Sequence, residues 1–203
     1  MKVIGLTGGM GMGKSTVANA FRRAGIPVFD ADAEVHRMYA PGGPVVRVLD
    51  AAFPGVVVDG AIDRGRLRAL VTTDAAKFAT LERLVHPLVL RAELTAVARA
   101  RRAGKRAVVI DNPLLFEMKL DAKLSRMQAR LADKVLVVSA PPKIQIHRVR
   151  KRGRMSEEQI KTVIAKQMPD AEKRRRADMV IRTGLSRHVT LRQVRRLILG
   201  LLA

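Results

Sequence analysis

The first residues that could carry out chemistry lie in a glycine-rich stretch near the N-terminus. The segment Gly8–Ser15 reads Gly-Gly-Met-Gly-Met-Gly-Lys-Ser and fits the phosphate-loop pattern G-x-x-x-x-G-K-[ST]. Backbone N–H groups of such a loop bind phosphate oxygens, its lysine reaches the terminal phosphates, and its hydroxyl ligates Mg²⁺. We therefore expect Ser15 to be the magnesium ligand. A nucleoside triphosphate should contact Gly9, Gly11, Met12, Gly13, Lys14, Ser15 and Thr16.

Carboxylates follow two later apolar segments. Asp30 and Asp32 come at the end of one such segment, and Asp111 ends another. A carboxylate in this position could accept the proton of an attacking hydroxyl group, and Asp32 is the candidate for this general base. Asp111 resembles the acid that orients Mg²⁺ in phosphate-loop enzymes. The alternative for each is a helix cap or turn residue, which is the favoured interpretation for Asp30.

Basic side chains in the second half of the chain could neutralise phosphate charge. Arg148 and Arg152 are four residues apart, so on a helix they would share one face and could clamp phosphates together. The alternative is a solvated helix face. His86 is by itself more typical of a cap or a half-buried side chain than of a catalyst. The tetrad Lys173–Arg176 is interpreted as a solvated surface rather than a nucleic-acid patch.

The elements that must position these residues alternate between apolar runs and helical patterns. A helix is expected to begin at Lys14, and continuous apolar runs between helices predict a parallel sheet covered on both faces. In such sheets the ligand crevice lies beyond the carboxyl ends of the strands, where the glycine loop and the acids fall. Between Ala33 and Gly104 we expect helices and no strand. The five predicted strands are Val3–Leu6, Ile26–Asp30, Ala107–Asp111, Lys134–Ser139 and Met179–Ile181.

Composition narrows the class of protein. The chain has 203 residues, 48% of them hydrophobic, and this length excludes a large multidomain protein. The chain has no cysteine, which excludes disulfide bonds and thiolate metal sites. No apolar run approaches the length of a spanning helix, and the N-terminal apolar stretch is too short for a signal peptide, so we expect a cytoplasmic protein without a membrane partner.

The charge is unusual. The net charge is +21, with 12 basic and 9 acidic residues in positions 1–98 and 27 basic and 9 acidic residues in positions 99–203. Such a charge predicts anionic partners and non-specific adsorption of polyanions. A nucleic-acid-binding ATPase is therefore one alternative, although one Tyr and five Phe provide few stacking platforms for bases. The absence of an Asn-Lys-x-Asp motif argues against a GTPase. A small-metabolite or nucleotide kinase fits better.

Several further motifs, taken with the phosphate loop, resemble the bacterial dephospho-CoA kinase family over nearly the whole chain. The string Asp111–Glu117, which reads Asp-Asn-Pro-Leu-Leu-Phe-Glu, is the most specific of them. The other matching pieces are Leu6–Thr16, Asp30–Asp32, Ile62–Arg64, Leu84–Pro87, Gln145 with Arg148 and Arg152, Gln167, and Ala177–Asp178.

The resemblance implies an α/β phosphate-loop kinase fold and an enzyme that transfers a phosphoryl group from Mg²⁺-bound ATP to the ribose 3′-hydroxyl of dephospho-CoA. It implies that Asp32 is the catalytic base, that Lys14 and Arg148 assist transfer, and that Arg148 and Arg152 belong to a lid over ATP. The positions that match the acceptor side are Arg64, His86 and Asp111, together with Asp32.

The same resemblance divides a single kinase domain into three parts. It implies a core of about 1–32, 105–142 and 168–203, a helical CoA-binding insert of about 33–104, and a lid of about 143–167. One departure lies after the last strand, where Thr183-Gly184 replaces an Asn-containing turn found in many members of the family.

Overall fold

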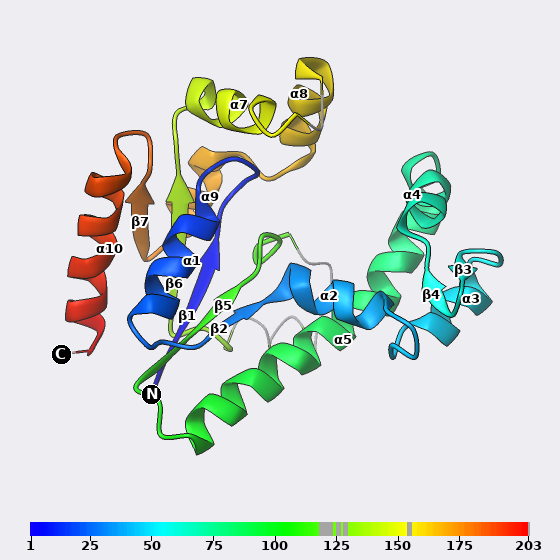
Figure 1. Ribbon diagram of the computed structural model, residues 1–203, viewed down its shortest axis with the longest axis horizontal. Coiled ribbons are helices and arrows are strands. Elements are labelled where there is room, and N and C mark those ends of the chain that lie inside the picture. Colours follow the sequence, from blue (N-terminus) through cyan, green and yellow to red (C-terminus); the bar gives the residue numbers. More distant parts are fainter. Residues whose placement is uncertain (118–123, 125–126, 128–129, 154–155, 203) are drawn as a thin grey trace. The chain divides into compact units, whose positions relative to one another are not determined.

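The computed structural model describes residues 1–117, 124, 127, 130–153 and 156–202 (Figure 1). Contacts divide the chain into two compact units. The first comprises Met1–Phe29, Ala96–Glu117 and Arg130–Ala203, and the second comprises Asp30–Thr95 and Met118–Ala129. The first unit holds the sheet and the glycine loop.

The five predicted strands are confirmed, and they form one parallel sheet in the order β2-β5-β1-β6-β7. β1 lies at the centre, where Leu6 is level with Asp111 of β5 and Leu136 of β6. β2 begins later than expected because it follows Pro27, which has no N–H to donate. The strands are β1 (Lys2–Thr7), β2 (Val28–Asp30), β5 (Ala107–Asp111), β6 (Lys134–Ser139) and β7 (Met179–Arg182).

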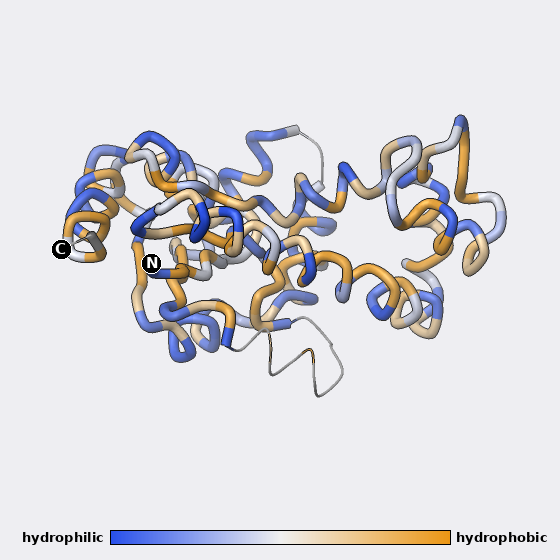
Figure 2. The backbone as a smooth tube through the Cα atoms, turned by 90° about the horizontal axis from the view of Figure 1, so that it is seen from below, coloured by the Kyte–Doolittle hydropathy of each residue, from blue (hydrophilic) through white to orange (hydrophobic). Residues whose placement is uncertain are grey.

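Helices cover the sheet of the first unit. Figure 2 shows polar and apolar colours alternating along the helical turns, as expected where one face of each helix is buried. α1 and α10 pack together, and their buried residues Phe21, Val194 and Ile198 join Ile4 and Leu6 of β1 in one apolar core. The helices with residues in this unit are α1 (Lys14–Arg23), the end of α5 (Ala75–Arg102), α7 (Pro142–Arg150), α8 (Glu157–Lys166), α9 (Asp170–Arg176) and α10 (Arg187–Leu202).

The second unit is mostly helical but contains a hairpin, so the expectation of no strand between Ala33 and Gly104 is wrong. β3 (Val57–Val58) and β4 (Ala61–Ile62) pair antiparallel around Asp59-Gly60. Both turn residues have positive φ, 50° and 76°, which is the requirement of a two-residue hairpin turn and the reason for the Asp-Gly pair. The helices here are α2 (Ala31–Tyr39), α3 (Val46–Ala52), α4 (Arg64–Thr72) and the first part of α5.

A buried ion pair fixes the segment that follows β5. Lys173 of α9, whose side chain is 2% exposed, pairs with Glu117 at 2.6 Å and donates to the Pro113 carbonyl at 3.1 Å. Thr7 at the end of β1 donates to the same carbonyl at 3.1 Å. The interpretation of Lys173 as a surface residue is therefore wrong. Its neighbours in the tetrad are partly exposed and pair with Asp170 and Glu172 on α9.

None of the helices within the described ranges has the length and apolar character needed to span a membrane.

We predict that Lys173→Met lowers the free energy of unfolding by about 3 kcal/mol, because it leaves Glu117 without its buried countercharge. Urea unfolding at neutral pH measures the change. Lys134→Met is the matched control, since Lys134 pairs with Asp178 at the surface with its side chain 56% exposed, and its loss should cost less than about 1 kcal/mol. Equal losses in the two variants would contradict a structural role for the buried pair.

Candidate active site

The glycine loop connects β1 to α1 with a backbone that only glycine adopts readily. Gly11 and Gly13 have φ values of 78° and 92°, and Gly13 caps α1 in the left-handed conformation. A Cβ on Gly11 would lie 2.7 Å from Val149 Cγ2 and 2.8 Å from the Gln145 carbonyl oxygen. The loop therefore packs closely against α7. Its N–H groups precede the positive end of α1, which is the arrangement that binds phosphate.

Side chains from the last third of the chain hold the loop. Gln145 donates to the Met10 carbonyl at 2.8 Å, and Gln167 accepts from the Met10 N–H at 3.1 Å. Thr183 donates to the Met12 carbonyl at 2.5 Å. Sequence reasoning included Gln145 and Gln167 in the family motifs without giving them a role. Their contacts with a loop more than 130 positions away have no signal in the local sequence.

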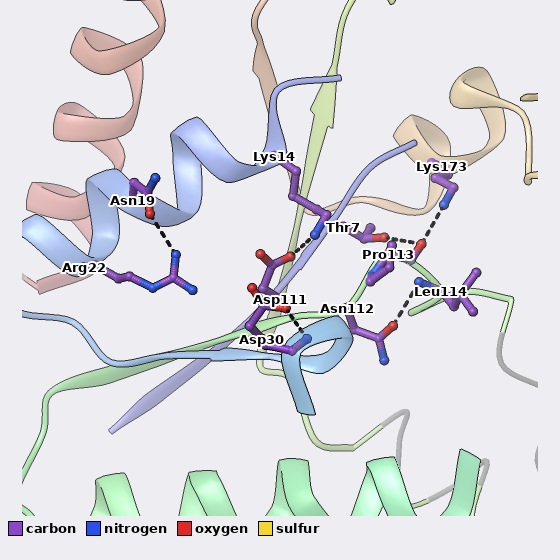
Figure 3. Close-up of polar contacts among 11 residues, drawn as sticks. Thr7, Lys14, Asn19, Arg22, Asp30, Asp111, Asn112, Pro113, Leu114 and Lys173 are labelled. Carbon is purple, nitrogen blue, oxygen red and sulfur yellow. Dashed lines mark hydrogen bonds and ion pairs between the residues drawn. The ribbon is translucent and has the colours of Figure 1, made fainter. Parts of the chain in front are cut away.

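Lys14 forms an ion pair with Asp111 (Figure 3). Asp111 is 3% exposed at the end of β5, and the parallel pairing of β5 with β1 brings it beside the start of α1. The lysine predicted to bind phosphate and the acid predicted to orient Mg²⁺ are thus in direct contact. Within the described part of the chain no group of three or more His, Asp or Glu side chains is placed to hold a metal.

A basic cavity of about 460 Å³ opens beside the first turn of α1. Arg148 lies in α7, but α7 ends at Arg150, so the prediction that Arg148 and Arg152 share a helix face is wrong. Arg152 lies in the following turn because Gly153, with φ 68°, ends the helix. Both arginines nevertheless line this cavity. Its other lining residues are Gly13, Ser15, Thr16, His147, Lys151, Thr183, Arg187 and Thr190.

Three predicted site residues lie in the second unit, on three different helices. Asp32 is exposed in the first turn of α2, Arg64 is the exposed first residue of α4, and His86 is 9% exposed in α5. Asp30 caps α2 by accepting from the Ala33 N–H at 3.0 Å, which confirms its favoured interpretation as a cap.

Tyr39 ends α2 and is electrostatically coupled to Arg64. Burial raises the pKa of the Tyr39 phenol above its ordinary value, while the charge of Arg64 acts in the opposite direction. The phenol is therefore a hydrogen-bond donor at neutral pH. Sequence reasoning did not single out this residue.

Three features together define a phosphate-loop kinase. They are a glycine loop between a central parallel strand and a helix, a lysine of that loop paired with an acid on the neighbouring strand, and a basic cavity beside the loop. A sequence model of the dephospho-CoA kinase family matches residues 2–186. The chain belongs to this family, and is thus an ATP-dependent phosphotransferase.

Individual relatives agree with this assignment. A dephospho-CoA kinase from Paramagnetospirillum magneticum is 52% identical over 174 residues, which cover 86% of this chain and 78% of that protein. A dephospho-CoA kinase from Bartonella quintana is 44% identical over 202 residues, which cover 100% of this chain and 99% of that protein.

Solved structures share the fold. The protein TT1252 from Thermus thermophilus has a TM-score of 0.83 and 33% identity, and the match covers 100% of this chain and 98% of that one. Dephospho-CoA kinase from Campylobacter jejuni has a TM-score of 0.66 and 21% identity, with 98% and 97% covered. Shikimate kinase from Acinetobacter baumannii has a TM-score of 0.55 and 20% identity, with 98% and 94% covered. The last two likenesses concern the fold alone.

We predict that Lys14→Met weakens Mg²⁺·ATP binding by at least about tenfold and lowers turnover by about two to three decades, because the terminal phosphates lose a cation. Calorimetric titration and a coupled assay of ADP release measure the two effects. Lys105→Met removes the same charge from an exposed position between α5 and β5 and should change neither by more than about twofold.

The double variant Lys14→Met/Asp111→Asn separates binding from stability. It removes the uncompensated buried carboxylate and should regain thermal stability lost in Lys14→Met. ATP binding should remain weak. Recovery of ATP binding in the double variant would contradict a direct role of Lys14 on phosphate.

Proposed function

We propose that the protein transfers the γ-phosphoryl group of ATP to the ribose 3′-hydroxyl of dephospho-CoA, giving coenzyme A and ADP. The observation that carries the proposal is the phosphate loop with its Lys14–Asp111 pair, beside a cavity lined by arginines, in a chain of the dephospho-CoA kinase family. Phosphoryl transfer requires positioning and charge neutralisation more than covalent chemistry, and these residues provide both.

On the ATP side, the loop from Gly9 to Thr16 binds the phosphates through backbone N–H groups and Lys14. Arg148 and Arg152 belong to a lid of about 143–167 that closes over ATP and excludes water. Their charge opposes the negative charge that spreads over the phosphoryl oxygens during transfer. The cavity that both arginines line supports this part of the proposal.

On the acceptor side, Asp32 is the general base for the 3′-hydroxyl. Its exposed position, two residues after the helix cap Asp30, leaves its carboxylate accessible to a substrate. Arg64 and His86 belong to a CoA-binding insert of about 33–104, where Arg64 provides a cation for phosphate and His86 a buried polar group. Asp111 holds Lys14 and completes the acceptor side.

Magnesium fits the residues present. Mg²⁺ takes oxygen ligands, keeps several water molecules and is bound in such sites by one or two protein groups and the substrate phosphates. The Ser15 hydroxyl lies exposed in the first turn of α1, on the cavity wall, and would hold the ion. The ion would neutralise charge on the phosphates of ATP. Lys14 and the loop N–H groups orient those phosphates.

The net charge of +21 supports electrostatic attraction of both substrates, which are polyanions. Nucleic acids would then adsorb without sequence preference. This proposal assigns the charge to the rate of encounter rather than to a specific nucleic-acid site.

We predict that Asp32→Asn lowers kcat by about two to four decades and leaves the Kd for ATP within about threefold, because it removes the base but no phosphate contact. Mass spectrometry of dephospho-CoA incubated with saturating Mg²⁺·ATP follows the product. Asp30→Asn is the matched control, since asparagine caps a helix as well as aspartate, and its kcat should remain near that of the wild type. If Asp32→Asn had the kcat of the wild type, Asp32 would not be the general base and would have only a structural place in α2.

Salt should affect the rate at which substrate meets the enzyme more than the rate of phosphoryl transfer. We predict that kcat/KM for dephospho-CoA falls between about 50 and 200 mM salt while kcat changes less, because screening weakens long-range attraction. Binding to DNA or RNA over the same range should be weak, independent of sequence, and reduced by decades where many phosphates are contacted. Tight, sequence-selective binding at about 200 mM salt, with stimulated ATP hydrolysis, would contradict this role of the charge.

A further inference from the structure

We propose that Thr183 is a positioning residue for nucleotide binding, which fixes the guanidinium group of Arg148 against the phosphate loop before ATP arrives. Thr183 is 3% exposed and lies one residue beyond β7. Its hydroxyl donates to the Met12 carbonyl at 2.5 Å and accepts from Arg148 Nη1 at 2.9 Å. The inference rests on the proposed role of Arg148 in binding ATP.

The backbone around Thr183 is itself constrained. The Thr183 N–H donates to the Ser139 carbonyl at 2.8 Å, which extends the β6–β7 pairing by one residue. Gly184 packs so closely on Pro141 that a Cβ at Gly184 would lie 2.5 Å from Pro141 Cδ. The hydroxyl of Thr183 is therefore presented from a rigid edge of the sheet rather than from a loop that adjusts.

Arg148 is held through both of its terminal nitrogens. Nη1 bonds the Thr183 hydroxyl, Nη2 donates to the Thr183 carbonyl at 2.5 Å, and Nη1 lies 3.5 Å from the carbonyl oxygens of Gly11 and Met12. A planar guanidinium anchored at two points has one orientation. Nε and the second hydrogen of Nη2 have no acceptor among the described residues, and we expect them to bind a ligand in the cavity that Arg148 lines.

Arg152 provides a contrast within the same cavity. The Arg152 side chain is exposed, and within the described part of the chain it makes no hydrogen bond, although the backbone N–H of Arg152 donates to the Val149 carbonyl. ATP must therefore order the Arg152 side chain when the proposed lid closes, whereas Arg148 lies at the base of that lid and is ordered already. The entropy lost on binding is smaller when the side chains that contact the ligand are already fixed. The Thr183 contacts should therefore increase the affinity for the nucleotide.

The chemistry requires one group that donates and accepts at once. The Thr183 hydroxyl does both, since it donates to the loop carbonyl and accepts from the arginine. Serine keeps both functions. Valine has nearly the same shape and keeps neither, although the backbone bond from Arg148 Nη2 to the residue 183 carbonyl remains possible.

A double-mutant cycle between Thr183→Val and Arg148→Ala tests the inference, with the Kd for Mg²⁺·ATP measured by calorimetry in the absence of acceptor. We expect Thr183→Val to weaken ATP binding roughly tenfold in the wild-type background and clearly less, about twofold to threefold, in the Arg148→Ala background, where only the bond to the Met12 carbonyl is lost. Thr183→Ser should bind ATP within about twofold of the wild type, and KM for dephospho-CoA should not change in either variant at saturating ATP.

Thr190→Val is the matched control. Thr190 is buried in the wall of the same cavity, but its hydroxyl donates to the Ser186 carbonyl and does not contact Arg148. Whatever its effect on Kd, that effect should be the same with and without Arg148. Thermal melting checks that each variant is folded, and if Thr183→Val is unfolded, Thr183→Ala and Thr183→Ser complete the same cycle.

Equal losses of affinity for Thr183→Val in the two backgrounds would overturn the inference, as would an unchanged Kd in the wild-type background or a loss in Thr183→Ser as large as in Thr183→Val. Because the titration contains no dephospho-CoA, its outcome is separate from that of the proposed function. A protein that binds ATP with the expected coupling but does not phosphorylate dephospho-CoA would refute the proposed acceptor and leave the role of Thr183 intact.

Discussion

The ion pair between Lys14 and Asp111 is the interaction around which the first unit is organised. It joins the helix that follows the phosphate loop to the strand beside it, and it requires β1 and β5 to be parallel neighbours that end at the same edge of the sheet. A buried carboxylate is costly unless a cation compensates it, and a loop built to attract phosphates supplies that cation. The segment after Asp111 is held as well, because Thr7 and Lys173 both donate to the Pro113 carbonyl.

Features that depend on local sequence could be predicted. The start of α1 at Lys14, the strand ending in Asp111 and the helix cap at Asp30 all follow from glycine conformation, apolar runs and capping chemistry, and all are present. The hairpin around Asp59-Gly60 was missed because its two strands have only two residues each. Such strands are too short to show an apolar period, so only the turn was visible in the sequence.

Features that depend on distant contacts could not be predicted. Lys173 stands among arginines in the sequence, and only the placement of Glu117 and Pro113 buries it. Arg148 and Arg152 have helical spacing, but α7 ends at Arg150, between the two arginines, ahead of the turn at Gly153. Thr183 was noticed as a departure from the family pattern, and nothing near it in the sequence identifies Met12 or Arg148 as its partners. Between Glu117 and β6, residues 118–123, 125–126 and 128–129 lie outside the described part of the chain.

The bonds that hold the phosphate loop also determine when, during translation, the loop can take its final shape. Met10 and Met12 are among the first residues translated, but their partners Gln145, Gln167 and Thr183 follow 135, 157 and 171 positions later. A nascent chain therefore carries a complete loop sequence for most of its translation without the groups that shape it. Nucleotide competence should arise late and abruptly, when the β7 edge emerges from the ribosome, and incomplete chains should not compete with the finished enzyme for cellular ATP.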